Sequence, residues 1–87
     1  MHEFSLMADL FRKIDTISRD NDNGQVVVVR VKLGALSHIT PDHFAEHFVE
    51  FSKGTPAEGA KLEVTQLEDM NDPNAQDILL DSVELAA

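Results

Sequence analysis

The first part of the chain carries apolar residues at helical spacing. Six of them form one stripe with a repeat of three or four positions: Leu6, Met7, Leu10, Phe11, Ile14 and Ile17. This pattern predicts an amphipathic helix, with Ser5 as its N-cap. The polar run Asp20–Gly24 competes for the backbone and ends in glycine, the residue type that most easily adopts a positive φ. We therefore expect the helix to end near residues 18–20.

A β-branched segment follows at residues 26–33 and is too short for a helix between its flanking turn signals. Strand alternation predicts one face with Val27, Val29, Val31 and Leu33 and an opposite face with Arg30 and Lys32. A run this rich in valine is typical of a strand buried inside a sheet. We expect it to be a long central strand.

The second half of the chain begins with a helix signal at Thr40, which can cap the helix, and Pro41, which suits its first position. This second helix is predicted to reach about Ser52 and to bury Phe44, Phe48 and Phe51. Strands follow at residues 61–67 and 78–85, joined by a polar loop over 68–76. The predicted order is a short strand, a helix, a strand, a helix and two strands. This is an α+β domain with two helices packed on a sheet of about three strands.

Composition narrows the functional classes. The 87 residues suit one small domain, and a net charge of −9 excludes DNA and RNA as direct partners, because their binding needs a basic face. The lack of cysteine excludes disulfides, thiolate zinc sites and cysteine nucleophiles. The longest apolar run covers only residues 26–29, and no basic segment precedes an apolar one. We therefore expect no transmembrane helix, no signal peptide and a cytoplasmic location.

The start of the chain, Met1-His2-Glu3, holds the most specific chemistry. The α-amine of Met1, the next backbone amide and the His2 imidazole can close chelate rings on one metal ion, and Glu3 can add a further ligand. Such a nitrogen-rich set suits Ni(II) or Cu(II). The competing interpretation is a surface histidine at a frayed end of the chain.

Two other segments resemble metal motifs. His43, Glu46 and His47 match the pattern His-x-x-Glu-His of inverted zinc proteases. Such an enzyme needs a further carboxylate ligand and a substrate cleft, so we favour a solvated helix flank that can still chelate nickel or zinc in vitro. The run Asp20–Gly24 is not an EF-hand, because that register puts Arg19 and Arg30 at ligand positions 1 and 12. His38 stands alone in a loop.

Four segments in order carry a resemblance to a known family. They are Met1-His2-Glu3-Phe4-Ser5-Leu6, Val31-Lys32-Leu33-Gly34-Ala35-Leu36-Ser37, Phe48-Val49-Glu50-Phe51 and the stretch from Gly54 to Val64. Together they resemble the HypA/HybF family, the nickel metallochaperones of [NiFe]-hydrogenase and urease maturation. The resemblance runs from residue 1 to about residue 66, and residues 78–85 look like the closing strand of the family.

The resemblance implies a nickel-binding domain with two helices against a three-stranded mixed sheet. It also implies that Ni(II) is held by the amine of Met1, by backbone and imidazole nitrogens of His2, and near Glu3. The implied partners are a nickel-insertion GTPase and the large subunit of a nickel enzyme.

The chain departs from the family between its last two strands. Family members carry there a zinc domain with two Cys-x-x-Cys pairs, whereas this chain has residues 67–77 and no cysteine. We therefore expect one domain over residues 1–87, with 67–77 a loop that replaces the zinc domain, and no structural zinc.

Three hypotheses follow from these residues. The first is a non-enzymatic nickel metallochaperone that binds Ni(II) at its N-terminus and delivers it to the maturation of a nickel enzyme such as [NiFe]-hydrogenase. The second is an interaction or regulatory module that keeps the fold, does not deliver metal and docks on a maturation factor. The third and remote one is a hydrolase that uses His43, Glu46 and His47.

Overall fold

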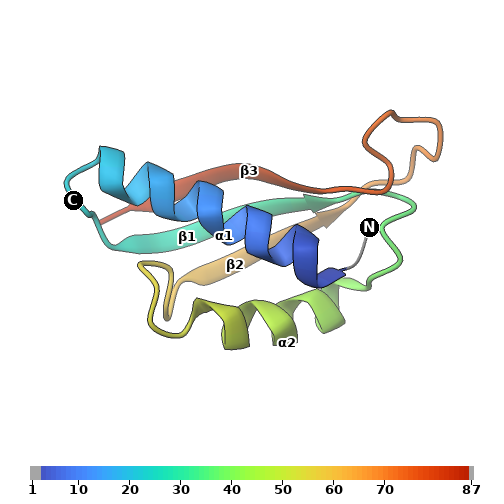
Figure 1. The fold of residues 1–87 in the computed structure, drawn as a ribbon. Helices are drawn as coiled ribbons and strands as arrows, with labels where there is room; N and C mark the ends of the chain where they lie inside the picture. Colours follow the sequence, from blue (N-terminus) through green and yellow to red (C-terminus); the bar gives the residue numbers. More distant parts are fainter. Residues whose placement is uncertain (1–2, 87) are drawn as a thin grey trace.

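The fold was analysed in a computed structural model that describes residues 3–86, with side chains from residue 5 onward. Five elements follow one another: α1 (Glu3–Asp20), β1 (Val26–Leu33), α2 (Pro41–Ser52), β2 (Lys61–Gln66) and β3 (Ile78–Leu85). Both helices lie on one face of a single sheet (Figure 1). The predicted α+β class is confirmed.

The sheet has three strands in the order β2-β1-β3, with β1 in the centre. β1 runs parallel to β2, where Val29 pairs with Leu62, and antiparallel to β3, where Val29 pairs with Val83. Parallel neighbours need a crossover connection, and α2 supplies it between β1 and β2. The sheet is therefore mixed, as the resemblance implied.

The boundaries of α1 correct two expectations. The helix begins at Glu3, so Ser5 lies inside the first turn and is not the N-cap. Glutamate is a good helix former, which lets the helix begin before Ser5. The short strand expected ahead of the helix does not include Glu3, and residues 1–2 lie outside the described residues.

The turn after α1 uses other residues than expected. Asp22 and Asn23 adopt positive φ values of 60° and 57°, while Gly24 does not. Asp and Asn tolerate this conformation because their short polar side chains can bond the local backbone. The helix still ends at Asp20, within the predicted range.

Val27 is the one residue of β1 whose predicted face is wrong. Val26 pairs with Leu85 and Val28 with Glu84, so Val27 is an extra residue in a β-bulge. A bulge shifts the alternation by one position. Val26 is consequently buried and Val27 is 40% exposed.

The core lies between the helices and the inner face of the sheet. It contains Met7, Leu10 and Ile14 from α1, Phe44 and Phe48 from α2, and Val26, Val29, Val31 and Leu33 from β1. Phe11 of α1 stacks against α2, with ring centroids 5.1 Å from Phe48 and 6.1 Å from Phe51. Phe51 is only partly buried. Of the predicted stripe on α1, Met7, Leu10 and Ile14 are in the core, Leu6 and Phe11 pack partly buried against it, and Ile17 is only partly buried.

α2 starts as predicted. The Thr40 hydroxyl accepts a hydrogen bond from the backbone N–H of His43 at 3.2 Å, and Pro41 occupies the first turn. This bond satisfies one of the amides that a helix start leaves without an intrahelical partner.

The outer face of the sheet is charged. The Arg30 guanidinium on β1 donates to Glu63 on β2 at 3.2 Å and to Glu84 on β3. The hydrogen bond that Arg30 donates to the Glu84 carboxylate is the largest cause that raises the pKa of Arg30, and the bond to Glu63 adds to it. Lys32 pairs with Asp81 at 3.6 Å on the same face. Between residues 3 and 86, no helix has both the length and the apolar character of a membrane span.

Candidate metal centre

The expected nickel ligands fall at the edge of the described structure. Met1 and His2 lie outside the described residues, and Glu3 is the first residue of α1, with its side chain also outside them. Within the described part, the structure shows how α1, to which this tripeptide is attached, is packed and which residues lie around the start of that helix.

α1 is held firmly along its inner stripe. Met7 and Ile14 are fully buried and Leu10 is 2% exposed. At the far end of the helix, the buried Ser18 hydroxyl donates to the Gly24 carbonyl at 2.8 Å. The tripeptide is thus attached to a helix whose position is fixed by the core.

The first turn of α1 borders the loop between β2 and β3. A hollow of about 500 Å³ lies between them and is lined partly by Ser5 and Leu6 of α1 and by Asn74 and Asp77 of the loop. Asp9 also lines it and pairs with Lys13 at 3.2 Å. The last part of this loop, at Asn74 and Asp77, therefore lies beside the first turn of α1.

This loop is fixed to the turn that follows β1. Gly34 N–H donates to the Asp77 carbonyl at 2.9 Å, and Leu36 N–H donates to the Ala75 carbonyl at 2.7 Å. A Cβ atom on Gly34 would overlap the Ala75 backbone, so only glycine permits this approach. This contact was not predicted from the sequence. Its signal was the position of Gly34 directly after a strand, inside one of the segments that carry the resemblance.

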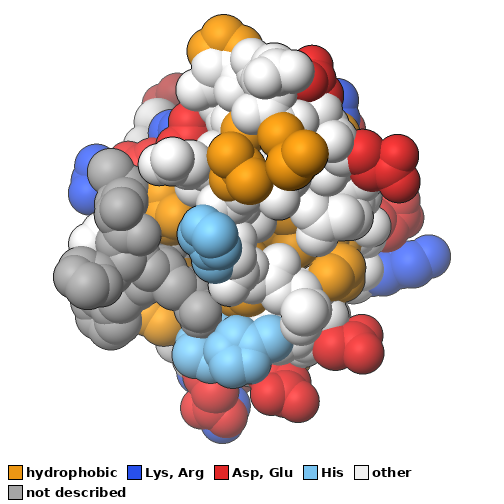
Figure 2. Space-filling model, turned by 90° about the vertical axis from the view of Figure 1, so that its right-hand side faces the viewer, with side chains coloured by type: hydrophobic (Ala, Val, Ile, Leu, Met, Phe, Trp, Pro, Cys, Tyr) orange, Lys and Arg blue, Asp and Glu red, His pale blue; other side chains and the backbone are white. Residues whose placement is uncertain are grey.

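The structure brings together the two histidines of α2. The ring centroids of His43 and His47 lie 4.4 Å apart, and the ring planes are tilted by 31°. His38, in contrast, is exposed in the loop before α2 with a φ of 61°. The N-terminal ends of both helices lie at one end of the molecule (Figure 1). Histidine side chains are visible on the surface at that end (Figure 2).

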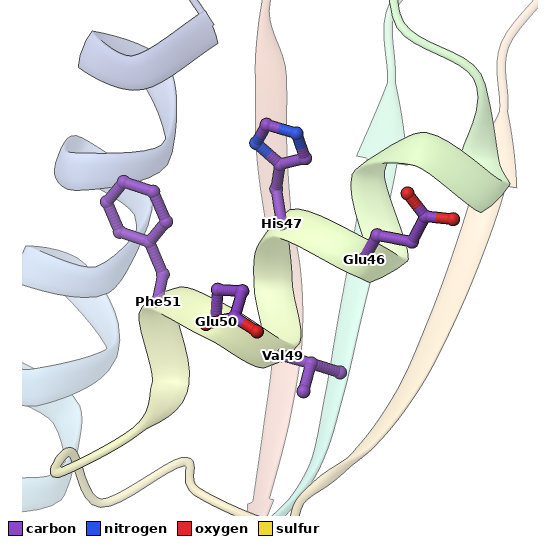
Figure 3. A pocket seen from close by; sticks show the side chains of 5 residues that line it. All are labelled: Glu46, His47, Val49, Glu50 and Phe51. Atoms are coloured by element: carbon purple, nitrogen blue, oxygen red, sulfur yellow. The ribbon is translucent and has the colours of Figure 1, made fainter.

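The hydrolase hypothesis gains no third ligand from this geometry. A shallow depression of about 680 Å³ on α2 is lined by Glu46, His47, Val49, Glu50 and Phe51 (Figure 3). Among the residues whose placement is described, no group of three or more histidine, aspartate or glutamate side chains is arranged to hold a metal ion. Within the described part of the chain, the inverted protease motif is thus a helical histidine pair, and the additional carboxylate ligand that such a zinc site needs is not assembled with it there.

Comparisons with known proteins decide the family. The family model described as hydrogenase/urease nickel incorporation, metallochaperone, hypA matches residues 1–71. This chain belongs to the HypA family. The hydrogenase maturation factor HypA of Desulfitobacterium hafniense (strain DSM 10664 / DCB-2) is 36% identical over 67 residues, which cover 77% of this chain and 59% of that protein. The HypA of Archaeoglobus fulgidus is 38% identical over 65 residues, or 75% of this chain and 59% of that protein.

The fold comparison agrees with this assignment. A solution structure of a HypA protein superimposes with a TM-score of 0.74 at 17% identity and covers 99% of this chain and 97% of the other. At that identity the match shows the fold alone. The chain spans about 59% of the length of the curated HypA relatives that it matches. It contains no cysteine and therefore none of the thiolate ligands expected in a HypA zinc domain.

Proposed function

We propose that this chain is the nickel-binding module of a HypA metallochaperone, and that it binds Ni(II) through Met1, His2 and Glu3. The family match carries the proposal, because it begins at residue 1 and includes the tripeptide. The chemistry of the donors supports it, since an amine, an amide and an imidazole suit square-planar Ni(II). The role is delivery of an ion and not catalysis.

The attachment of the tripeptide to α1 suits transfer of the ion. A chelate at a chain terminus can be approached by a competing ligand, and protonation of its nitrogens loosens the metal. The proposed recipients are a nickel-insertion GTPase and the large subunit of a nickel enzyme such as [NiFe]-hydrogenase. Residues 67–77 are proposed to stand where longer family members carry the zinc domain.

The test is a Ni(II) titration by calorimetry and absorbance. The protein must carry a free amine on Met1, because residues left ahead of it by a tag would remove that ligand. We expect a site with a square-planar absorption band in the native chain and loss of that band in His2→Ala.

The matched control is His38→Ala, which removes an exposed histidine from a loop and should leave the band intact. A band that persists in His2→Ala would refute the terminal site. The second hypothesis, an interaction module that does not deliver metal, would then be the better explanation. The absence of cysteine from these 87 residues favours that alternative.

A further inference from the structure

α2 carries two imidazoles in a position to share a metal ion. His43 and His47 are four residues apart, which puts them on one side of the helix. Their ring centroids are 4.4 Å apart. In Figure 3, the side chain of His47 projects outward from the helix, next to a depression that Glu46 and Glu50 also line.

The ring separation fits a chelate. A metal–imidazole bond of about 2.0–2.1 Å, plus about 1.1 Å from the nitrogen to the ring centre, places each ring centre about 3.2 Å from the ion. Two such rings bound at a right angle have centres about 4.5 Å apart, and at a tetrahedral angle about 5.2 Å apart. The observed 4.4 Å is close to the right-angle value. The separation of the two rings is therefore compatible with both imidazoles binding one ion.

The charge of α2 favours a cation. The helix contains Asp42, Glu46 and Glu50 and neither lysine nor arginine. Lys53, just beyond its end, pairs with Glu50 at 3.3 Å. The position of His43 in the first turn opposes cation binding, because the positive end of the helix dipole lies there. The three carboxylates along the same helix offset this effect.

From these observations we infer that His43 and His47 form a second metal site, which takes a borderline divalent cation such as Cu(II), Ni(II) or Zn(II). The inference goes beyond the proposed function and does not depend on the terminal site. Among the described residues, no third protein ligand is assembled with this pair, so the site is argued from the two imidazoles alone.

The number of donors distinguishes this site from the terminal one. Two imidazoles hold an ion less tightly than four donors. The preference among ions follows the general order of nitrogen ligands, with Cu(II) bound more tightly than Ni(II) or Zn(II), and with hard ions such as Mg²⁺ not bound.

Metal-dependent thermal stability tests the site. The His2→Ala protein removes the terminal imidazole and serves as the background for all other variants. A metal that binds only the folded helix stabilises the native state, so Cu(II), Ni(II) and Zn(II) should raise the Tm by several degrees and Mg²⁺ should not. Adding His47→Gln, or separately His43→Gln, should abolish the rise. Adding His38→Gln should leave it unchanged.

The number of bound ions separates this inference from the proposed function. The native chain should bind two Ni(II) ions in calorimetry, His2→Ala one, and His2→Ala with His47→Gln none. One ion in the native chain that is lost in His2→Ala would overturn the helical site and keep the terminal one. One ion in the native chain that persists in His2→Ala and is lost only on adding His47→Gln would keep the helical site and overturn the terminal one.

A further measurement uses His2→Ala without any other substitution, so its result does not depend on whether the His43 and His47 variants fold. Paramagnetic Ni(II) should broaden the imidazole NMR signals of His43 and His47 and leave those of His38 sharp. Equal broadening of all three histidines would show unspecific binding and contradict the inference.

Discussion

The two faces of the sheet differ in what they contribute. The inner face buries Val29, Val31 and Leu33 of β1 beneath both helices. The outer face carries Arg30 and Lys32 of the same strand, which pair with carboxylates on the neighbouring strands. Successive residues of one strand thus serve two different environments.

This difference shows where the stability and the charge of the domain lie. Burial of apolar side chains is the dominant favourable term in folding, and in this chain it is concentrated on the inner face. Exposed ion pairs contribute little each, so the outer face mainly keeps charge in solvent. The proposed metal ligands belong to neither face of the sheet: they are proposed at the start of α1 and on α2.

The largest effect is expected from Phe44, which is fully buried on the inner side of α2. Phe44→Ala should lower the free energy of unfolding by about 3–5 kcal/mol, because it removes a ring and leaves a cavity. Urea denaturation followed by circular dichroism measures this. Val49→Ala on the same helix, at a side chain that is 58% exposed, should change stability by less than about 0.5 kcal/mol. Similar losses in both variants would contradict the assignment of the buried face.

A medium effect is expected within β1 and tests the β-bulge. Val29→Thr puts a hydroxyl into the core and should cost about 1–3 kcal/mol. Val27→Thr should cost less than about 0.5 kcal/mol, because Val27 is the exposed bulge residue. Simple alternation predicts equal losses, since it places both residues on the buried face. Paired denaturation curves distinguish the two arrangements.

The smallest effect is expected from Arg30→Gln on the outer face. The loss should be below that of Val29→Thr and should shrink further in high salt, because the pairs with Glu63 and Glu84 are exposed to solvent. The raised pKa of Arg30 gives a stabilising contribution that is complete at every pH below the ordinary pKa of arginine and is lost only at still more alkaline pH. The difference in the free energy of unfolding between the native chain and Arg30→Gln should therefore not change with pH near neutrality as a result of Arg30 titration. A loss that is insensitive to salt would argue against a simple surface ion pair.

Most of the elements were predictable because local signals coincide with the helix and strand boundaries. Thr40 and Pro41 mark the start of α2, and the valine-rich run marks β1. The start of α1 was misplaced by three residues, because Ser5 as N-cap would put the first helical residue at Leu6, whereas the helix begins at Glu3. Val27 was misplaced because a bulge depends on the partner strand, which the local pattern does not contain.

The candidate site was predictable only as a set of donors. The chemistry of Met1, His2 and Glu3 follows from their residue types and order, and its use in nickel binding stays a prediction. The pairing of His43 with His47 follows from their spacing and is confirmed at 4.4 Å between ring centroids. The absence of a third ligand among the described residues could not be foreseen, because it depends on which other side chains the fold brings near α2.

The sequence by itself determined the helices, the strands and the ligand types, because these depend on apolar periodicity, capping residues and side-chain chemistry within a few positions. The tertiary structure decided which residues meet across the chain. It set the mixed strand order, the bulge at Val27 and the contact of Gly34 with Ala75 beside the start of α1. These contacts join segments far apart in sequence, so packing and not local pattern selects them.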